Sequence, residues 1–146
     1  MSEIPPDETT PVMDALVQVS FAVLDLLSRS AAEFDLSVTQ LRLMGILRDR
    51  SPSMAALADY LGLDRSSVSG LIDRAERRGL VARRTSVDDA RVTLIDLTPA
   101  GRKLGEQLEA RVSARTEQLL ETVAPAERTG FVRMAEAILG KATIRG

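Results

Sequence analysis

The side chains best suited to recognising a ligand lie between residues 64 and 98. Short hydroxyl groups come first along this stretch, and guanidinium groups follow. A serine hydroxyl can donate to or accept from several base edges in a DNA major groove, and an arginine can form two hydrogen bonds with guanine O6 and N7. On a helix, the exposed side that would face DNA comprises Arg65, Ser66, Ser67, Ser69, Gly70 and Arg74.

A second interpretation of this stretch is a solvated helix face on which arginine and acidic side chains pair at helical spacing. Periodicity alone does not separate the two interpretations. Arg77 and Arg78 stay open between phosphate contacts and pairs with Asp73 and Glu76.

Two β-prone runs, residues 80–85 and 92–97, flank a polar loop and predict a hairpin. Arg83 and Arg84 lie in its first strand. With Arg65 they are expected to contact phosphates, which position a protein on a duplex without reading its sequence. The hairpin favours the DNA interpretation of the preceding helix.

The helix that positions these groups is predicted from Asp64 to Arg78. Asp64 is a good N-cap, because its carboxylate can accept from free backbone N–H groups of the first turn. Gly79 suits the left-handed residue that ends many helices. The apolar side recurs at helical spacing and consists of Val68, Leu71, Ile72 and Ala75.

Two shorter helices come before this one. A capping box of Ser37 and Gln40 opens the first, and Ser53 can cap the second, which ends near Gly62. A short helix joined by a tight glycine turn to a second helix is the helix-turn-helix unit, in which the second helix contacts the bases.

Long helices are expected at both ends of the chain. Thr98 and Pro99 form an N-cap with proline at the first helical position, and a last helix starts at Pro125. The N-terminal helix, residues 11–35, is apolar on more than one side and needs more than one partner, although Phe21 is expected to pack in the core. We therefore expect a homodimer whose interface includes Leu16, Val19, Val23, Leu119, Phe131 and Ile138.

These elements predict a mainly α protein with a small β-hairpin wing, an α/β winged helix-turn-helix fold. The expected divisions are a flexible arm over residues 1–10, a dimerisation helix over 11–35, the winged helix over 36–98 and dimerisation helices over 99–146.

Composition restricts the function. The 146 residues contain no histidine and no cysteine. This removes disulfides, thiol chemistry, the usual zinc sites and the commonest general base. We therefore expect neither an enzyme nor a bound cofactor or metal. Aromatic residues make up 3% of the chain, which leaves little surface for stacking single-stranded bases.

The net charge of −2 conceals an asymmetry along the chain. Residues 1–41 carry seven acidic residues and one basic residue, a net of −6, whereas residues 64–103 carry nine basic and six acidic residues, a net of +3. DNA responds to the field within about 8–10 Å, the Debye length in physiological salt. The basic segment is the expected DNA face.

The apolar run over residues 12–27 is interrupted by Asp14 and Asp25. It falls short of the roughly 20 apolar residues that span a bilayer. Residues 1–11 lack the basic start of a secretory signal. We expect a cytoplasmic protein with no membrane partner.

Several of these segments, in their order and spacing, resemble the MarR family of winged-helix regulators (multiple-antibiotic-resistance type). The resemblance covers residues 36–104 and, through the order of helices, nearly the whole chain. The matching segments are Leu36-Ser37-x-x-Gln40, Leu57 to Ser69, Ile72 to Val81, Asp88 to Arg91, and Leu97-Thr98-Pro99-Ala100-Gly101. The chain departs from the family's pattern at Gly70 and Ala90, where relatives often carry longer polar or basic residues.

The resemblance implies a homodimer that binds a pseudo-palindromic operator in double-stranded DNA. It implies a repressor that a small phenolic or lipophilic molecule releases, although the sequence names no pocket residue for it. It also implies that Arg91, oriented by Asp89, enters the minor groove, where an arginine gains from the negative potential of a narrow groove. The alternative for this pair is an exposed ion pair worth about 1 kcal/mol at most.

Two other functions stay open. A winged helix can bind protein in place of DNA, and Gly70, Ala90 and the small positive charge of the basic segment leave room for that. Such a module would show no salt-dependent affinity for duplex DNA. An enzyme ranks last, because the sequence has no histidine, no cysteine and no glycine-rich phosphate loop.

Overall fold

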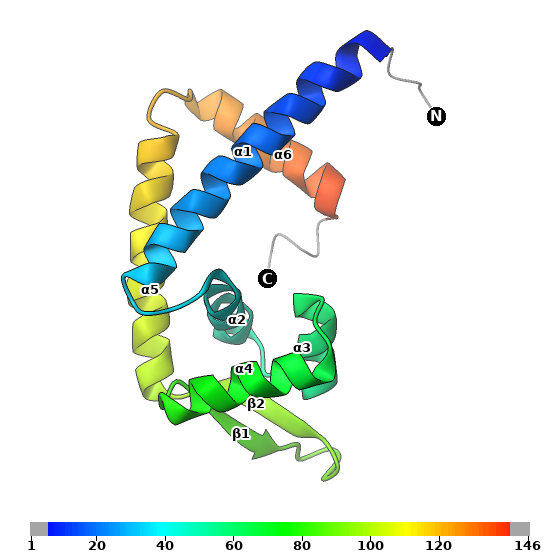
Figure 1. Ribbon diagram of the computed structural model, residues 1–146, viewed down its shortest axis with the longest axis vertical. Helices are drawn as coiled ribbons and strands as arrows, with labels where there is room; N and C mark the ends of the chain where they lie inside the picture. Colours follow the sequence, from blue (N-terminus) through cyan, green and yellow to red (C-terminus); the bar gives the residue numbers. More distant parts are fainter. Residues whose placement is uncertain (1–5, 141–146) are drawn as a thin grey trace.

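The computed structural model describes residues 6–140, in which six helices and one hairpin form an upper and a lower part (Figure 1). α1, α5 and α6 make up most of the upper part, and α2, α3, α4 and the hairpin make up the lower part. The elements are α1 (Pro6–Ala32), α2 (Val38–Asp49), α3 (Met54–Leu61), α4 (Arg65–Arg77), β1 (Val81–Thr85), β2 (Thr93–Leu97), α5 (Pro99–Leu119) and α6 (Pro125–Leu139). The predicted fold class, mainly α with a β-hairpin wing, is confirmed.

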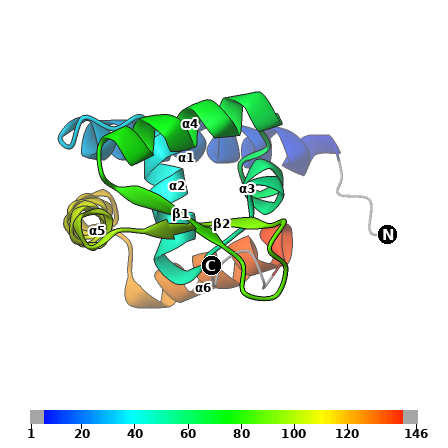
Figure 2. The same cartoon turned by 90° about the horizontal axis from the view of Figure 1, so that it is seen from below.

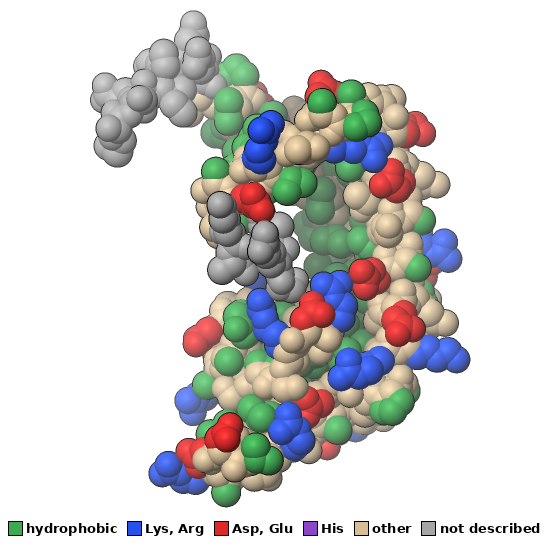
Figure 3. Space-filling view, turned by 180° about the vertical axis from the view of Figure 1, so that it is seen from behind, with side chains coloured by type: hydrophobic (Ala, Val, Ile, Leu, Met, Phe, Trp, Pro, Cys, Tyr) green, Lys and Arg blue, Asp and Glu red, His purple; other side chains and the backbone are tan. Residues whose placement is uncertain are grey.

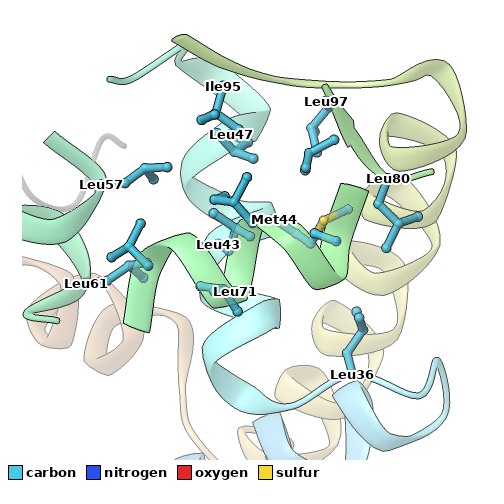
Figure 4. Close-up of a cluster of buried hydrophobic side chains, with 14 of the residues drawn as sticks. Leu36, Leu43, Met44, Leu47, Leu57, Leu61, Leu71, Leu80, Ile95 and Leu97 are labelled. Carbon is cyan, nitrogen blue, oxygen red and sulfur yellow. The ribbon is translucent and has the colours of Figure 1, made fainter. Parts of the chain in front are cut away.

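One aliphatic core holds the lower part together (Figure 4). Leu43 and Leu47 of α2, Leu57 of α3, Ile72 of α4 and Ile95 of β2 are all buried in it. The whole predicted apolar stripe of α4 is buried too. Each such side chain contributes about 1.5–3 kcal/mol on burial, so the core fixes the side of α4 that remains outside.

Side-chain caps set the helix boundaries, as the sequence predicts. Ser37 Oγ accepts from Gln40 N at 3.1 Å, and Gln40 Oε1 accepts from Ser37 N at 2.8 Å. Ser53 Oγ accepts from Ala56 N at 3.1 Å. Each cap satisfies an N–H group that has no partner within its helix, which is worth about 1 kcal/mol.

The hairpin is antiparallel, with Val81 opposite Leu97 in its register. Ile95 N donates to Pro52 O at 2.9 Å, which attaches β2 to the turn between α2 and α3. Val81, Ile95 and Leu97 are buried against the core. Because these contacts fix the base of the hairpin to the core, its far end projects from the lower part.

The turn after α4 is held against the start of α5. Thr98 Oγ1 donates to Gly79 O at 2.6 Å, and Thr98 N donates to Leu80 O at 3.0 Å. Gly79 has a φ of +70°, the left-handed conformation predicted for the end of this helix. Gly101 lies so close that a Cβ there would be 2.0 Å from Leu80 O.

We expect Gly101→Ala to lower the free energy of unfolding by about 1–3 kcal/mol, because overpacking forces the backbone apart. Gly105→Ala is the matched control in the same helix, since its Cβ would meet nothing within 4 Å. It should raise stability by up to about 1 kcal/mol through helix propensity. Urea unfolding measures both, and equal stability of the two variants would contradict the close approach at Gly101.

α1 begins earlier than expected. Residues 6–10 are helical, so the flexible arm predicted over residues 1–10 is wrong for that part, and residues 1–5 lie outside the described residues. A proline such as Pro6 is tolerated at the first helical position, because its missing N–H has no intrahelical partner there. Pro11, inside the helix, forfeits one backbone hydrogen bond.

The upper part leaves many apolar side chains exposed. The six predicted interface residues are between 37% and 63% exposed: Leu16, Val19, Val23, Leu119, Phe131 and Ile138. Phe21 is 67% exposed, so the expectation that it packs in the core is wrong. Figure 3 shows hydrophobic side chains lining a hollow between the upper and lower parts.

The apolar surface of α1 bears on the membrane question. From Thr9 to Ala32 the helix is long and apolar enough to cross a membrane, with a mean hydropathy of 1.5, so the expectation that this run is too short is wrong. The helix extends beyond the run identified in the sequence, which supplies the extra length. One such helix is weak evidence for a membrane span, because core helices of globular proteins pass the same test.

Candidate nucleic-acid interface

α4 and the hairpin lie together at the end of the molecule farthest from α6 (Figures 1 and 2). The buried stripe of α4 faces the core, so its opposite side, with Arg65, Ser66, Ser67 and Arg74, is exposed at this end. Ser69 and Gly70 are half-buried beside them. The structure thus brings together the residues predicted for the recognition helix.

A carboxylate organises the first turn of α4. Asp64 accepts from Ser67 N at 2.8 Å, from Ser66 Oγ at 2.6 Å and from Ser67 Oγ at 2.7 Å. These bonds, led by the one from Ser66, hold the pKa of Asp64 well below its usual range. Both hydroxyl protons are directed at Asp64, so towards a base each serine presents its lone pairs as an acceptor.

Because the folded pKa of Asp64 is depressed, its contribution to stability is present above the unfolded pKa of about 3.9 and is lost as pH falls below that value. An asparagine side chain at this position would still cap the helix without titrating. We therefore expect Asp64→Asn to make the melting temperature fall less steeply than in the wild type between about pH 4 and pH 2. Asp59→Asn, an exposed acid on α3, is the control. Identical acid profiles for all three proteins would contradict the hydrogen-bonded cap.

Arg74 lies across Gly70. A Cβ at Gly70 would be 3.2 Å from Arg74 Nη1, so the absence of a side chain leaves the space that the guanidinium occupies. Both residues line a shallow pocket on the surface, together with Ser37, the N-cap of α2, and Thr39 of α2. Within residues 6–140, the side chain of Arg74 forms no hydrogen bond or ion pair, so its charge is available to a ligand.

Two arginines of β1 are paired with carboxylates. Arg83 binds Asp73 at 2.7 Å and Glu76 at 2.6 Å, and Arg84 binds Asp96 at 2.7 Å. The expected phosphate contacts of Arg83 and Arg84 remain predictions, and a phosphate would have to compete with these acids. The single positive charge of Arg83 also offsets part of the negative charge of Asp73 and Glu76 on α4, beside the basic face.

Neither Arg77 nor Arg78 forms the pair with Asp73 or Glu76 that was one alternative, and a phosphate contact of Arg77 remains a prediction. Arg78 Nη1 donates to Asp35 O at 2.8 Å, and Nη2 donates to Phe34 O at 3.0 Å. Asp73 and Glu76 are occupied by Arg83. The side chain of Arg77 is exposed and makes no polar contact with any described side chain or backbone group.

The tip of the wing carries the predicted arginine–aspartate pair. Arg91 Nε and Nη2 each lie 3.1 Å from a carboxylate oxygen of Asp89, and Arg91 N donates to Asp89 Oδ1 at 3.0 Å. The Arg91 guanidinium lowers the pKa of Asp89. The Arg91 side chain is 90% exposed, so the pair orients an arginine towards solvent from the end of the hairpin.

A cavity of about 240 Å³ lies between α2, the end of β2 and α5. Its apolar lining consists of Leu41, Met44, Leu97, Leu108 and Val112. Two arginines and two glutamates also line it, Arg48, Arg102, Glu106 and Glu109, and Arg48 is paired with Glu109 at 3.3 Å. The sequence could not identify this cavity, because its lining comes from three elements whose packing no local pattern records. Among residues 6–140, no group of three acidic side chains is placed to bind a metal.

The fold and this surface define a winged helix-turn-helix protein, and comparison with known proteins shows which family it resembles. The sequence profile of the MarR family matches residues 34–92. The resemblance to that family is therefore confirmed over residues 34–92. A solved MarR-family regulator from Rhodococcus sp. RHA1, 24% identical, has the same fold over 92% of this chain and 96% of its own, with a TM-score of 0.78.

Individual proteins resemble this chain in sequence and in fold. YfiV of Bacillus subtilis, an uncharacterized HTH-type transcriptional regulator, is 27% identical over 97 residues, which are 66% of this chain and 61% of YfiV. The chain thus spans less than two thirds of that relative's length. The structure of RV1404 from Mycobacterium tuberculosis is 28% identical, with a TM-score of 0.75 over 97% of both chains. CouR from Rhodococcus jostii RHA1, solved with p-coumaroyl-CoA bound, is 25% identical, with a TM-score of 0.74 over 89% of this chain and 92% of CouR.

Proposed function

We propose that this protein is a cytoplasmic, homodimeric transcriptional regulator that binds a pseudo-palindromic operator, represses transcription there and is released by a small molecule. The observation that carries the proposal is the surface at one end of the molecule, where Arg65, Arg74 and Arg77 on α4 and Arg91 on the wing are all exposed. Guanidinium groups on a helix and an adjoining wing suit base edges and phosphates of a duplex. This is a binding function, and we propose no catalytic one.

A second copy of the chain accounts for the exposed apolar residues of the upper part. Leu16 and Val19 of α1 and Phe131 and Ile138 of α6 are roughly half exposed or more. Contiguous exposed apolar patches mark interaction sites. A dimer through these helices would hold two copies of α4 at a fixed distance, and successive major grooves on one side of a duplex lie about 34–36 Å apart.

The DNA-binding proposal is tested by anisotropy titrations of a duplex selected from a random pool, repeated over a series of salt concentrations. Arg91→Ala should weaken binding and reduce any preference for A·T pairs beneath the wing, because an arginine gains most in a narrow minor groove. Arg74→Ala should relax the preference at one base position at a cost of about 1–3 kcal/mol. Glu121→Ala, a substitution far along the chain from α4, is the control.

Unchanged affinity and base preference in Arg74→Ala would contradict its assignment to the reading surface. Weak binding of the wild type, without an enriched sequence and without a salt dependence, would favour the alternative function, a winged helix that binds protein.

The cavity between α2, β2 and α5 is the site where we propose that the effector binds. α2 and β2 belong to the winged helix, and α5 leads into the upper part, so a ligand between them contacts both. A ligand that binds one relative arrangement better shifts the population towards it. CouR, which was solved with p-coumaroyl-CoA bound, supports a small-molecule effector.

Gly105 lines this cavity, and a Cβ there would meet no atom within 4 Å. Gly105→Leu should therefore fill the cavity while leaving the fold intact, and Gly105→Ala is the control for helix propensity. Hydroxylated aromatic acids are the probes, and release of a labelled duplex is the readout. We expect acids that release the wild type to need at least roughly tenfold higher concentrations with Gly105→Leu, about 1.4 kcal/mol in affinity. If Gly105→Leu releases the duplex at the same acid concentration as the wild type and Gly105→Ala, the effector does not bind in this cavity.

A further inference from the structure

The end of α4 is tied to a distant corner of the chain by a single side chain. Arg78, the C-cap of α4, donates from Nη1 to Asp35 O at 2.8 Å and from Nη2 to Phe34 O at 3.0 Å. The two carbonyls belong to the corner between α1 and α2. Hydrogen bonds from a charged donor are shorter and stronger than neutral ones, and the planar guanidinium engages both oxygens at once.

The corner whose carbonyl groups accept hydrogen bonds from Arg78 is a regular backbone turn. Leu36 N donates to Ala31 O at 3.0 Å and Asp35 N donates to Ala32 O at 3.1 Å, the paired bonds of a Schellman motif. Asp35 has a φ of +55°, in the left-handed conformation that glycine usually supplies. Ala31 and Leu36 are buried. A movement of α1 therefore carries these carbonyls with it.

The other side of the same turn is attached to α5. Thr98 bonds to Gly79 O and Leu80 O, and Gly101 packs directly on Leu80 O. α1 and α5 also contact each other. The C-terminal end of α4 thus lies between two helices of the upper part, joined to α1 through Arg78 and to α5 through Thr98.

We propose that Arg78 is a positioning residue that fixes the angle of α4 relative to α1, and thereby the spacing of operator half-sites that the dimer accepts. The inference rests on the proposed function. Without the guanidinium, α4 keeps its buried stripe, its Asp64 cap and its attachment to α5, but its link to α1 is lost.

The chain offers a matched control in the neighbouring residue. Arg77→Ala and Arg78→Ala each remove one positive charge from the same turn of α4. Because Arg77 belongs to the proposed DNA surface, the variants are compared by the ratio of their affinities for duplexes of different spacing, which a uniform loss of charge or of a phosphate contact leaves unchanged. The Arg77 side chain makes no polar contact with another described residue, whereas the Arg78 guanidinium donates to Asp35 O and Phe34 O. A difference between the two variants therefore reports the contact and not the charge.

The experiment measures affinity for the selected inverted repeat and for versions with one base pair added or removed between the half-sites. We expect the wild type and Arg77→Ala to lose at least roughly tenfold in affinity when the spacing changes, about 1.4 kcal/mol. Arg78→Ala should lose no more than about threefold, because its recognition helices can reorient. If Arg78→Ala discriminates spacing as sharply as Arg77→Ala, the inference is wrong. A wild type that binds no duplex overturns the proposed function as well.

Hydrogen exchange gives a readout that needs no DNA. The amide hydrogens of Asp35 and Leu36 should exchange faster in Arg78→Ala than in Arg77→Ala, because their corner is no longer bound to α4. Should Arg78→Ala not fold, Arg78→Gln retains one donor group and is expected to show an intermediate loss of spacing discrimination. Unchanged exchange at both amides in the folded variant would contradict the coupling.

Discussion

The apolar surface that α1 and α6 cannot bury within one chain is the constraint on which the rest of this structure depends. The lower part has a closed aliphatic core, whereas α6 contributes no buried residue. Over residues 9–32 of α1, where burial is described, the buried residues are Ser30 and Ala31 at the C-terminal end. Exposed apolar surface of this kind is typical of interaction sites. A second copy would cover it and would also explain why a winged helix is carried on helices this long, because their packing sets the distance between two recognition surfaces.

The arginines of the basic segment divide into two groups with different tasks. The side chains of Arg78, Arg83 and Arg84 are exposed but bind other groups of the protein, either backbone carbonyls or carboxylates, and so connect the corner, the wing and α4. Arg74 and Arg91 lie at the surface with their charges directed outwards. The net charge of the segment is therefore a poor guide to its DNA face. The placement of guanidinium groups that are free to contact a ligand describes the proposed DNA face better than the net charge does.

Local patterns in the sequence were sufficient for the elements and their caps. The capping box at Ser37, the left-handed Gly79 and the buried stripe of α4 all follow from short-range rules, and the structure has each of them. Contacts between distant segments were not predictable in this way. The hydrogen bonds from Arg78 to Phe34 and Asp35 join residues more than 40 positions apart. The cavity beside α5 forms only when α2, β2 and α5 have packed together. The start of α1 was missed because prolines near a helix start are compatible with either a loop or a first turn.

Sedimentation velocity on the full chain without DNA tests the central claim most directly. The account predicts one species of two chains at micromolar concentration, and a shift towards single chains when Phe131 and Ile138 are replaced by glutamate. A species of one chain in the wild type, or a protein that stays dispersed only in detergent, would contradict the account. The first result would leave the apolar surface uncovered, and the second would assign α1 to a membrane.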